Sequence, residues 1–155
     1  MSGASEHRPW RTRGRSLAGA VMLAAIAFTA APAAATELTV HETAHLHMVS
    51  HSHLSIVEEG NGSGTLSGRL TLHLMLSLTG GSVTFTAYPP GGTISGRGEG
   101  TSYAKGNTAY FTGTASITGG TGKYSHASAH NVQLHGSLQR HTFAFFVELS
   151  ARLRY

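Results

Sequence analysis

Leucines recur at alternate positions between residues 66 and 78, and this alternation restricts the fold more than any other feature of the sequence. The even positions carry Leu66, Leu70, Leu72, Leu74, Leu76 and Leu78, whereas polar residues such as Arg69 and His73 occupy odd ones. A period of two directs successive side chains to opposite faces of a strand, so one face is buried and the other is exposed. The pattern predicts β-structure here.

The same alternation continues towards the C-terminus, where Phe143, Phe145, Val147 and Leu149 repeat it. Glycine-rich segments at 60–64, 105–107 and 119–122 separate the apolar runs and are typical of turns. We predict about seven or eight strands, at 38–57 (one strand or two), 65–78, 82–88, 93–104, 108–117, 126–135 and 141–153.

Short connections between these strands favour antiparallel neighbours, and closing the sheet removes its exposed edges. We therefore expect an all-β fold, a small closed antiparallel β-barrel of about eight strands. Gly96, Gly98 and Gly113 interrupt strand-like runs, as bends do where a small barrel must curve.

Residues 1–35 have the organisation of a cleavable signal peptide. Arginines at 8, 11, 13 and 15 precede an apolar stretch, residues 16–35, that ends in Ala33-Ala34-Ala35. We predict processing after Ala35 and a secreted, extracellular barrel domain over 36–155. The alternative is an uncleaved anchor, since 16–35 is about long enough to span a bilayer. The chain has no cysteine, so the barrel must fold without disulfides.

Charge excludes one class of partner. After residue 35 the sequence has seven Lys and Arg and six Glu, a net charge of about +1. Because phosphate binding needs clustered Lys and Arg, we expect no nucleic acid partner, and the same argument disfavours anionic membrane surfaces. The processed protein has no stable membrane anchor in this interpretation.

Two segments resemble a known family. Residues 117–124 read ITGGTGKY and are followed by Ala127 and Ser128, and residues 92–98 read GTISGRG. The first segment resembles the strand, GGTGK-aromatic turn and second strand of dirigent proteins and allene oxide cyclase-like barrels, and the second resembles the glycine-containing strand that precedes this motif. The resemblance is to the secreted bacterial type of this family and extends over residues 60–155. The resemblance implies an eight-stranded barrel with a central apolar cavity, commonly a homotrimer in plant members. Dirigent proteins use acidic side chains, notably Asp, and this chain has no Asp, so catalytic residues are not carried over.

One motif resembles a zinc protease site. His41-Glu42-Thr43-Ala44-His45 matches H-E-x-x-H, and His51 stands where an extended motif has its third histidine. That motif must be helical, so that both histidines grip zinc while the glutamate activates water. The alternation of Leu38, Val40, Leu46 and Met48 predicts a strand instead, so a zinc metalloprotease is the weakest functional alternative.

On an unbroken strand, the odd-numbered histidines at 41, 45, 47, 51 and 53 share one face. His45 and His47 then have the spacing of metal ligands, and His73 on an adjacent strand is the candidate third ligand for zinc. The other interpretation is a solvated polar face without metal.

We expect the barrel interior to bind a small apolar or phenolic molecule, as a carrier or as a template for its cyclisation or coupling. An enzyme of this kind would have cyclase- or isomerase-like or dirigent-like activity, and no cofactor is required. Tyr88, Arg97, Tyr103 and Tyr110 are the residues predicted near the cavity mouth. The alternative is a non-enzymatic extracellular surface or assembly module with histidine-mediated metal binding.

Overall fold

The computed structural model describes residues 36–155, and the regular structure there is entirely β. The strands are β1 (Glu37–Ser52), β2 (Ser55–Gly64), β3 (Gly68–Leu76), β4 (Gly80–Tyr88), β5 (Gly92–Lys105), β6 (Thr108–Gly122), β7 (Ala129–Gln139) and β8 (Phe145–Arg154). The predicted signal peptide, residues 1–35, lies outside the described residues. Residues 36–155 include no helix with the length and apolarity needed to cross a membrane.

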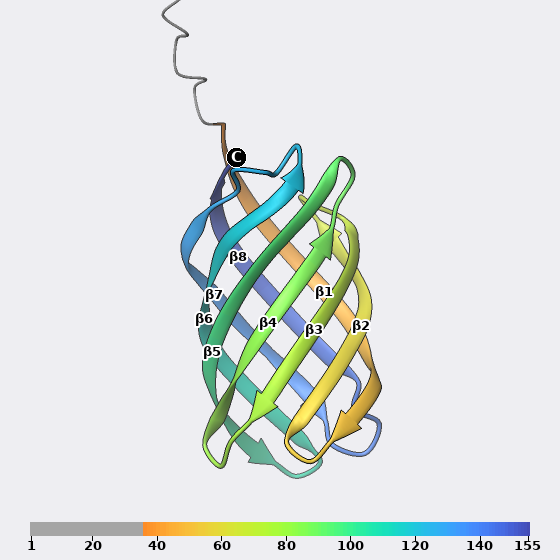
Figure 1. Cartoon of the computed structure of the whole chain (residues 1–155). Coiled ribbons are helices and arrows are strands. Elements are labelled where there is room, and N and C mark those ends of the chain that lie inside the picture. Colours follow the sequence, from red (N-terminus) through yellow and green to blue (C-terminus); the bar gives the residue numbers. More distant parts are fainter. Residues whose placement is uncertain (1–35) are drawn as a thin grey trace, which may run out of the picture. The chain divides into compact units, whose positions relative to one another are not determined.

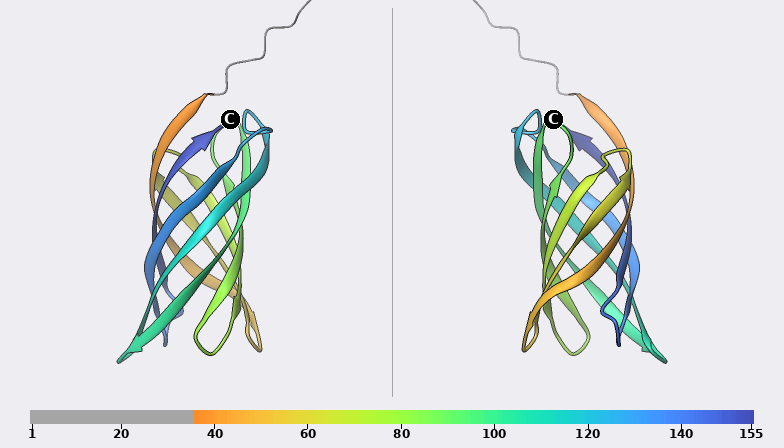
Figure 2. Two further views of the ribbon diagram at one scale, coloured as in Figure 1. Left: turned by 90° about the vertical axis from the view of Figure 1, so that its left-hand side faces the viewer. Right: turned by 90° about the vertical axis from the view of Figure 1, so that its right-hand side faces the viewer.

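Each strand pairs antiparallel with its neighbour in sequence, and β8 pairs with β1, so the sheet closes into a barrel (Figure 1). The predicted closed antiparallel barrel of eight strands is confirmed. Connections 53–54, 77–79, 106–107 and 140–144 lie at one end, the hairpin end. Connections 65–67, 89–91 and 123–128 lie at the other, the terminal end, together with the C-terminus (Figures 1 and 2).

The barrel interior holds two clusters of buried side chains. The first includes Val40, Ile94, Ile117, Tyr124 and Leu153. The second, from β1, β3 and β8, consists of Ala44, Leu46, Leu70, Leu72, Phe145 and Val147. Apart from Tyr124, which lies in the β6–β7 connection, these residues are apolar members of the alternating strands. Burying them supplies the main force that stabilises a chain without disulfides.

The strand predicted over 38–57 is two strands, β1 and β2, joined at His53, which has a φ of 51°. The turn predicted at 60–64 is wrong, because β2 continues through it to Gly64. Gly60 lies opposite Leu46, where an added Cβ would come within 2.0 Å of the carbonyl oxygen of His45. This glycine therefore permits close approach of two strands instead of forming a turn.

The turn predicted at 119–122 is displaced in the same way. β6 runs through Gly122, and Gly119 and Gly120 pair with Ser95 and Ile94. The chain turns later, at 123–128, so the strand predicted from residue 126 begins at Ala129. At Gly120 the opposing backbone occupies the space of a side chain, because an added Cβ would lie 2.1 Å from the carbonyl oxygen of Thr93, whereas no atom lies within 4 Å of an added Cβ at Gly119.

A candidate ligand-binding cavity inside the barrel

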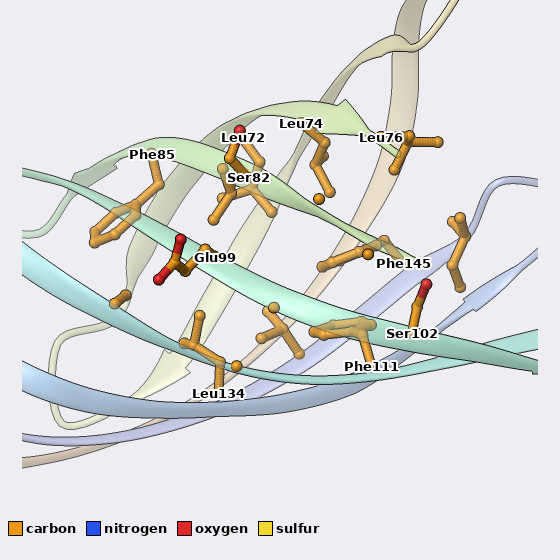
Figure 3. Close-up of a pocket in the computed structure, with 18 of the residues that line it drawn as sticks. Leu72, Leu74, Leu76, Ser82, Phe85, Glu99, Ser102, Phe111, Leu134 and Phe145 are labelled. Carbon is orange, nitrogen blue, oxygen red and sulfur yellow. The ribbon is translucent and has the colours of Figure 1, made fainter. Parts of the chain in front are cut away.

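The barrel encloses a cavity of about 490 Å³ on the side formed by β3 to β8. Its wall is mainly aliphatic and aromatic, and Figure 3 shows the side chains that converge on it from different strands. The apolar lining side chains are Leu70, Leu72, Leu74, Leu76, Val83, Phe85, Ala109, Phe111, Ala115, Ile117, Val132, Leu134, Leu138, Phe143, Phe145, Val147 and Leu149.

Glycines explain why this side of the barrel is hollow. Gly81, Gly100 and Gly113 are direct cross-strand neighbours on β4, β5 and β6, and all three line the cavity. They alternate with exposed residues and so occupy inward positions without a side chain. A Cβ on Gly100 would lie 2.6 Å from the carbonyl oxygen of Thr112, so a larger residue would need the backbone to shift. The row of glycines therefore leaves a space that no neighbouring side chain fills.

Two stacked aromatic rings form part of the wall. Phe111 and Phe145 have ring centroids 4.8 Å apart with planes inclined by 16°, which is offset-stacking geometry. The ring of Phe111 also lies against Gly136, where an added Cβ would be 2.5 Å from the ring carbon Cζ. Contacts on both sides hold the Phe111 ring in one orientation, and this gives the cavity a defined shape.

The cavity opens at the hairpin end. Its lining there includes Ser77, Ser102 and Arg140, which are exposed to solvent. At the terminal end, Tyr124 and Leu153 are only 2% and 0% exposed and belong to a packed cluster. The site is therefore an apolar chamber with a closed base and polar groups at its mouth.

Two carboxylates face the interior without lining the cavity. Glu58 on β2 is 0% exposed, and neither carboxylate oxygen has a hydrogen-bond partner. Its cross-strand neighbours are Met48 and Leu72, both apolar. Because burial in these surroundings disfavours the charged form, the pKa of Glu58 is raised from 4.5 to about 7.

Glu42 on β1 is the second interior carboxylate. One oxygen accepts a hydrogen bond from the backbone N–H of Leu66, and Oε2 has no partner. Burial raises the pKa of Glu42, and the Leu66 hydrogen bond opposes this effect. The interior position of these two carboxylates was not predicted from the sequence. The signal was present, because Glu42 and Glu58 occupy even positions, in phase with the inward residues of β1 and β2.

None of the four residues predicted to surround the mouth lines the cavity, because Tyr88, Arg97, Tyr103 and Tyr110 take the exposed phase of their strands. Tyr103 and Tyr110 pair across β5 and β6 near the hairpin end, with ring centroids 5.5 Å apart. Tyr88 lies at the terminal end, where the guanidinium of Arg69 is 4.5 Å from its ring centroid. The even–odd alternation of β4, β5 and β6 directs these side chains outward.

The H-E-x-x-H motif lies on β1 and not on a helix. His41 and His45 are exposed, whereas Glu42 occupies an inward position of the barrel. The two histidines and the glutamate are therefore on opposite faces of one strand. This arrangement does not form the zinc protease site that the motif suggests.

The proposed zinc ligands are only partly brought together. His45 and His47 are exposed on β1, but β2 lies between them and His73 on β3. A register shift between Met48 and Ser50 interrupts β1, so His51 pairs with the buried Ile56 and does not share the face of the earlier histidines.

Within residues 36–155, no group of three or more His, Asp or Glu side chains is positioned to hold a metal ion. The histidine metal site has no geometric support from this arrangement.

The fold and its site thus define a closed, eight-stranded antiparallel barrel with an apolar interior chamber. No protein-family model matches the chain, and no match was found among curated proteins or solved structures. The resemblance of residues 92–98 and 117–124 to dirigent and allene oxide cyclase-like barrels stays a prediction.

Proposed function

We propose that this protein binds a small apolar molecule in the barrel cavity and acts as its carrier. The observation that carries the proposal is the chamber of about 490 Å³, whose wall is mainly Leu, Val, Phe, Ala and Gly. Cavities of roughly 300–1,000 Å³ accommodate small organic ligands, and their affinity comes mainly from removing apolar surface from water. The chamber suits a lipophilic molecule of that size.

The polar groups at the mouth give the bound molecule an orientation. Ser77, Ser102 and Arg140 border the cavity at the hairpin end, Ser82, Glu99 and Thr101 border it along β4 and β5, and the remaining wall is apolar. A ligand with one polar end would keep that end at the mouth, because burying it deeper would cost its hydrogen bonds to water. We expect elongated molecules with a single hydroxyl, carbonyl or carboxylate to bind better than molecules polar at both ends.

A carrier agrees better with this wall than a catalyst. The titratable side chains that border the cavity are Glu99 and Arg140, both exposed, and the buried Glu42 and Glu58 do not border it. Acid–base catalysis of a cyclisation or coupling needs a proton donor or acceptor within hydrogen-bond reach of the ligand, and Glu99, the carboxylate that borders the cavity, lies on the outward phase of β5. We therefore place binding, not chemistry, at the centre of the proposal.

Fluorescence titration with N-phenyl-1-naphthylamine, a neutral apolar dye, tests the proposal directly. We expect saturable binding of one dye per subunit. Val83→Phe places a ring in the chamber and should weaken dye binding at least about tenfold, since a filled cavity cannot accept the ligand. Thr84→Phe is the matched control, because it adds the same ring at the neighbouring exposed position.

Circular dichroism must show that each variant keeps its β-structure, and Leu134→Phe is a second cavity-filling change if Val83→Phe does not fold. Unchanged dye affinity in a folded cavity-filled variant would show that the chamber is not the binding site. Native mass spectrometry of the purified protein reports any co-purified ligand and the subunit number.

A further inference from the structure

Large exposed apolar side chains concentrate at one end of the barrel. Among the described residues they are Val49, Leu54, Met75, Leu78, Tyr103, Tyr110 and Tyr88. All but Tyr88 lie in or beside the connections of the hairpin end, and we call these six residues the apolar rim. Scattered exposed apolar residues are ordinary, but this distribution is one-sided and surrounds the mouth of an apolar cavity.

Side chains at the tips of two hairpins are among the most exposed of the apolar rim, together with Tyr103, which is 65% exposed. Leu78, in the β3–β4 connection, is 105% exposed, and Leu54, in the β1–β2 connection, is 59% exposed. The β5–β6 hairpin, which carries the stacked Tyr103 and Tyr110, stands apart from the other hairpins in the side views (Figure 2). The exposed parts of these side chains are available to an external apolar phase.

Charge in the connections at this end is positive, whereas Glu99 faces outward on β5 and is separated from Met75 of the apolar rim by Ser82 on β4. The four segments 52–55, 76–80, 103–110 and 139–145 contain Lys105 and Arg140 and no Asp or Glu. His53 and His141 lie on the same connections and add positive charge when protonated. The near-zero net charge after residue 35 therefore conceals a local separation, because strand topology brings these basic groups to one end.

We propose that the hairpin end docks on the surface of an anionic lipid bilayer. Leu54 and Leu78 would enter the boundary of the acyl region, the tyrosines would lie at the headgroup level, and Lys105 and Arg140 would face the anionic headgroups. Amphipathic surfaces bind membrane interfaces through this combination of apolar burial and basic charge. Tyrosine is enriched at the same depth because its ring is apolar and its hydroxyl is polar.

Docking in this orientation would connect the cavity directly with the bilayer. The mouth, bordered by Ser77 and Arg140, would open onto lipid, so a lipophilic molecule could enter or leave without crossing water. This last step rests on the proposed carrier function, whereas the docking itself does not. The proposal departs from the expectation from net charge alone, which disfavours anionic membranes, because Lys105 and Arg140 both lie at this end.

The test protein is residues 36–155, which keeps the basic and apolar residues 1–35 out of a lipid assay. This segment contains every strand pairing that closes the barrel and both core clusters. Vesicle flotation measures its partitioning onto phosphatidylcholine vesicles with and without phosphatidylglycerol. We expect binding to the anionic vesicles that weakens as salt is raised.

Variants at the apolar rim should reduce partitioning onto anionic vesicles. The double variant Leu54→Ser and Leu78→Ser should weaken it at least about tenfold, since two exposed leucines no longer enter the interface. Lys105→Glu should weaken it several-fold through charge reversal. Tyr88→Ser removes an exposed aromatic residue from the terminal end and should leave partitioning unchanged, so it is the matched control.

Three results would overturn the proposal: no partitioning of the wild-type protein, equal partitioning onto neutral vesicles, or unchanged partitioning of the double leucine variant. If the leucine changes abolish only self-association in analytical ultracentrifugation, the apolar rim is a contact between copies and the lipid proposal is wrong. Dye titration without vesicles separates the two proposals. If the protein binds the dye normally but does not bind vesicles, the docking proposal is wrong and the carrier proposal stands. If it binds vesicles but not the dye, the carrier proposal is wrong and the docking proposal stands.

Discussion

The buried carboxyl of Glu58 makes the stability of the barrel depend on pH. Its pKa is raised from 4.5 to about 7, so between these values the folded protein keeps a proton that the unfolded chain has lost. The contribution of Glu58 to the free energy of unfolding is therefore fully present below about pH 4.5. It decreases as pH rises and no longer changes above about pH 7. Since one pKa unit corresponds to about 1.4 kcal/mol, the total loss from this group is about 3 kcal/mol.

Glu58→Gln isolates this contribution, because glutamine has nearly the same shape and carries no charge. The variant should match the wild-type protein near pH 4.5 and exceed its free energy of unfolding by about 3 kcal/mol at pH 8, from the pKa displacement of Glu58. Denaturant unfolding followed by far-ultraviolet circular dichroism, at intervals from pH 4.5 to 8, measures the difference. Other titrating groups cancel because both proteins share them.

Glu59→Gln is the control. Glu59 is the next residue on β2, and its side chain lies on the opposite face of the sheet from that of Glu58. This variant should not reproduce the pH-dependent gain. A constant difference between Glu58→Gln and wild type across this range would refute the assignment of a buried, proton-holding carboxyl. If the glutamine variant does not fold, Glu58→Leu supplies the same comparison, because leucine also removes the ionisable group.

Three further changes test local contacts. Gly136→Ala should cost about 1–3 kcal/mol in thermal unfolding, because the new methyl group would lie 2.5 Å from the ring of Phe111, and a neutral effect would contradict this packing. Glu148→Gln removes the 2.5 Å contact between the Glu148 carboxylate and His135 Nε2, but the side chains are 42% and 62% exposed, so denaturant unfolding should show a change below about 1 kcal/mol. Gly106 has a φ of 61° and no atom within 4 Å of an added Cβ, so Gly106→Asn should lower the melting temperature less than Gly106→Val, and the reverse order would be inconsistent with this backbone conformation.

Much of the fold follows from local pattern. The alternation of Leu70, Leu72 and Leu74 correctly indicates the inward face of β3, because a strand directs successive side chains to opposite sides. The antiparallel order follows from short connections, and barrel closure from the need to remove free edges. The same parity places Glu42 and Glu58 inside, although acidic side chains are not expected there from composition.

Strand register was not available from this pattern. A period of two tells which face a residue occupies but not which residue of the next strand lies opposite. The cavity depends on that second quantity, because Gly81, Gly100 and Gly113 create a hollow only when they are cross-strand neighbours. A one-residue bulge between Met48 and Ser50 also exchanges the two faces, which is why His51 departs from the histidines before it.

The sequence by itself determined the β-structure, the inward and outward phases of most strands and the absence of disulfides. The tertiary structure alone decided the position of the cavity, the isolation of Glu58 from any partner, and the gathering of Leu54, Leu78, Lys105 and Arg140 at one end. The physical reason is the distance along the sequence between the residues involved. Side-chain alternation is a property of adjacent residues, whereas a hollow, a desolvated charge and a docking surface each depend on residues from separate strands that meet only when the barrel closes.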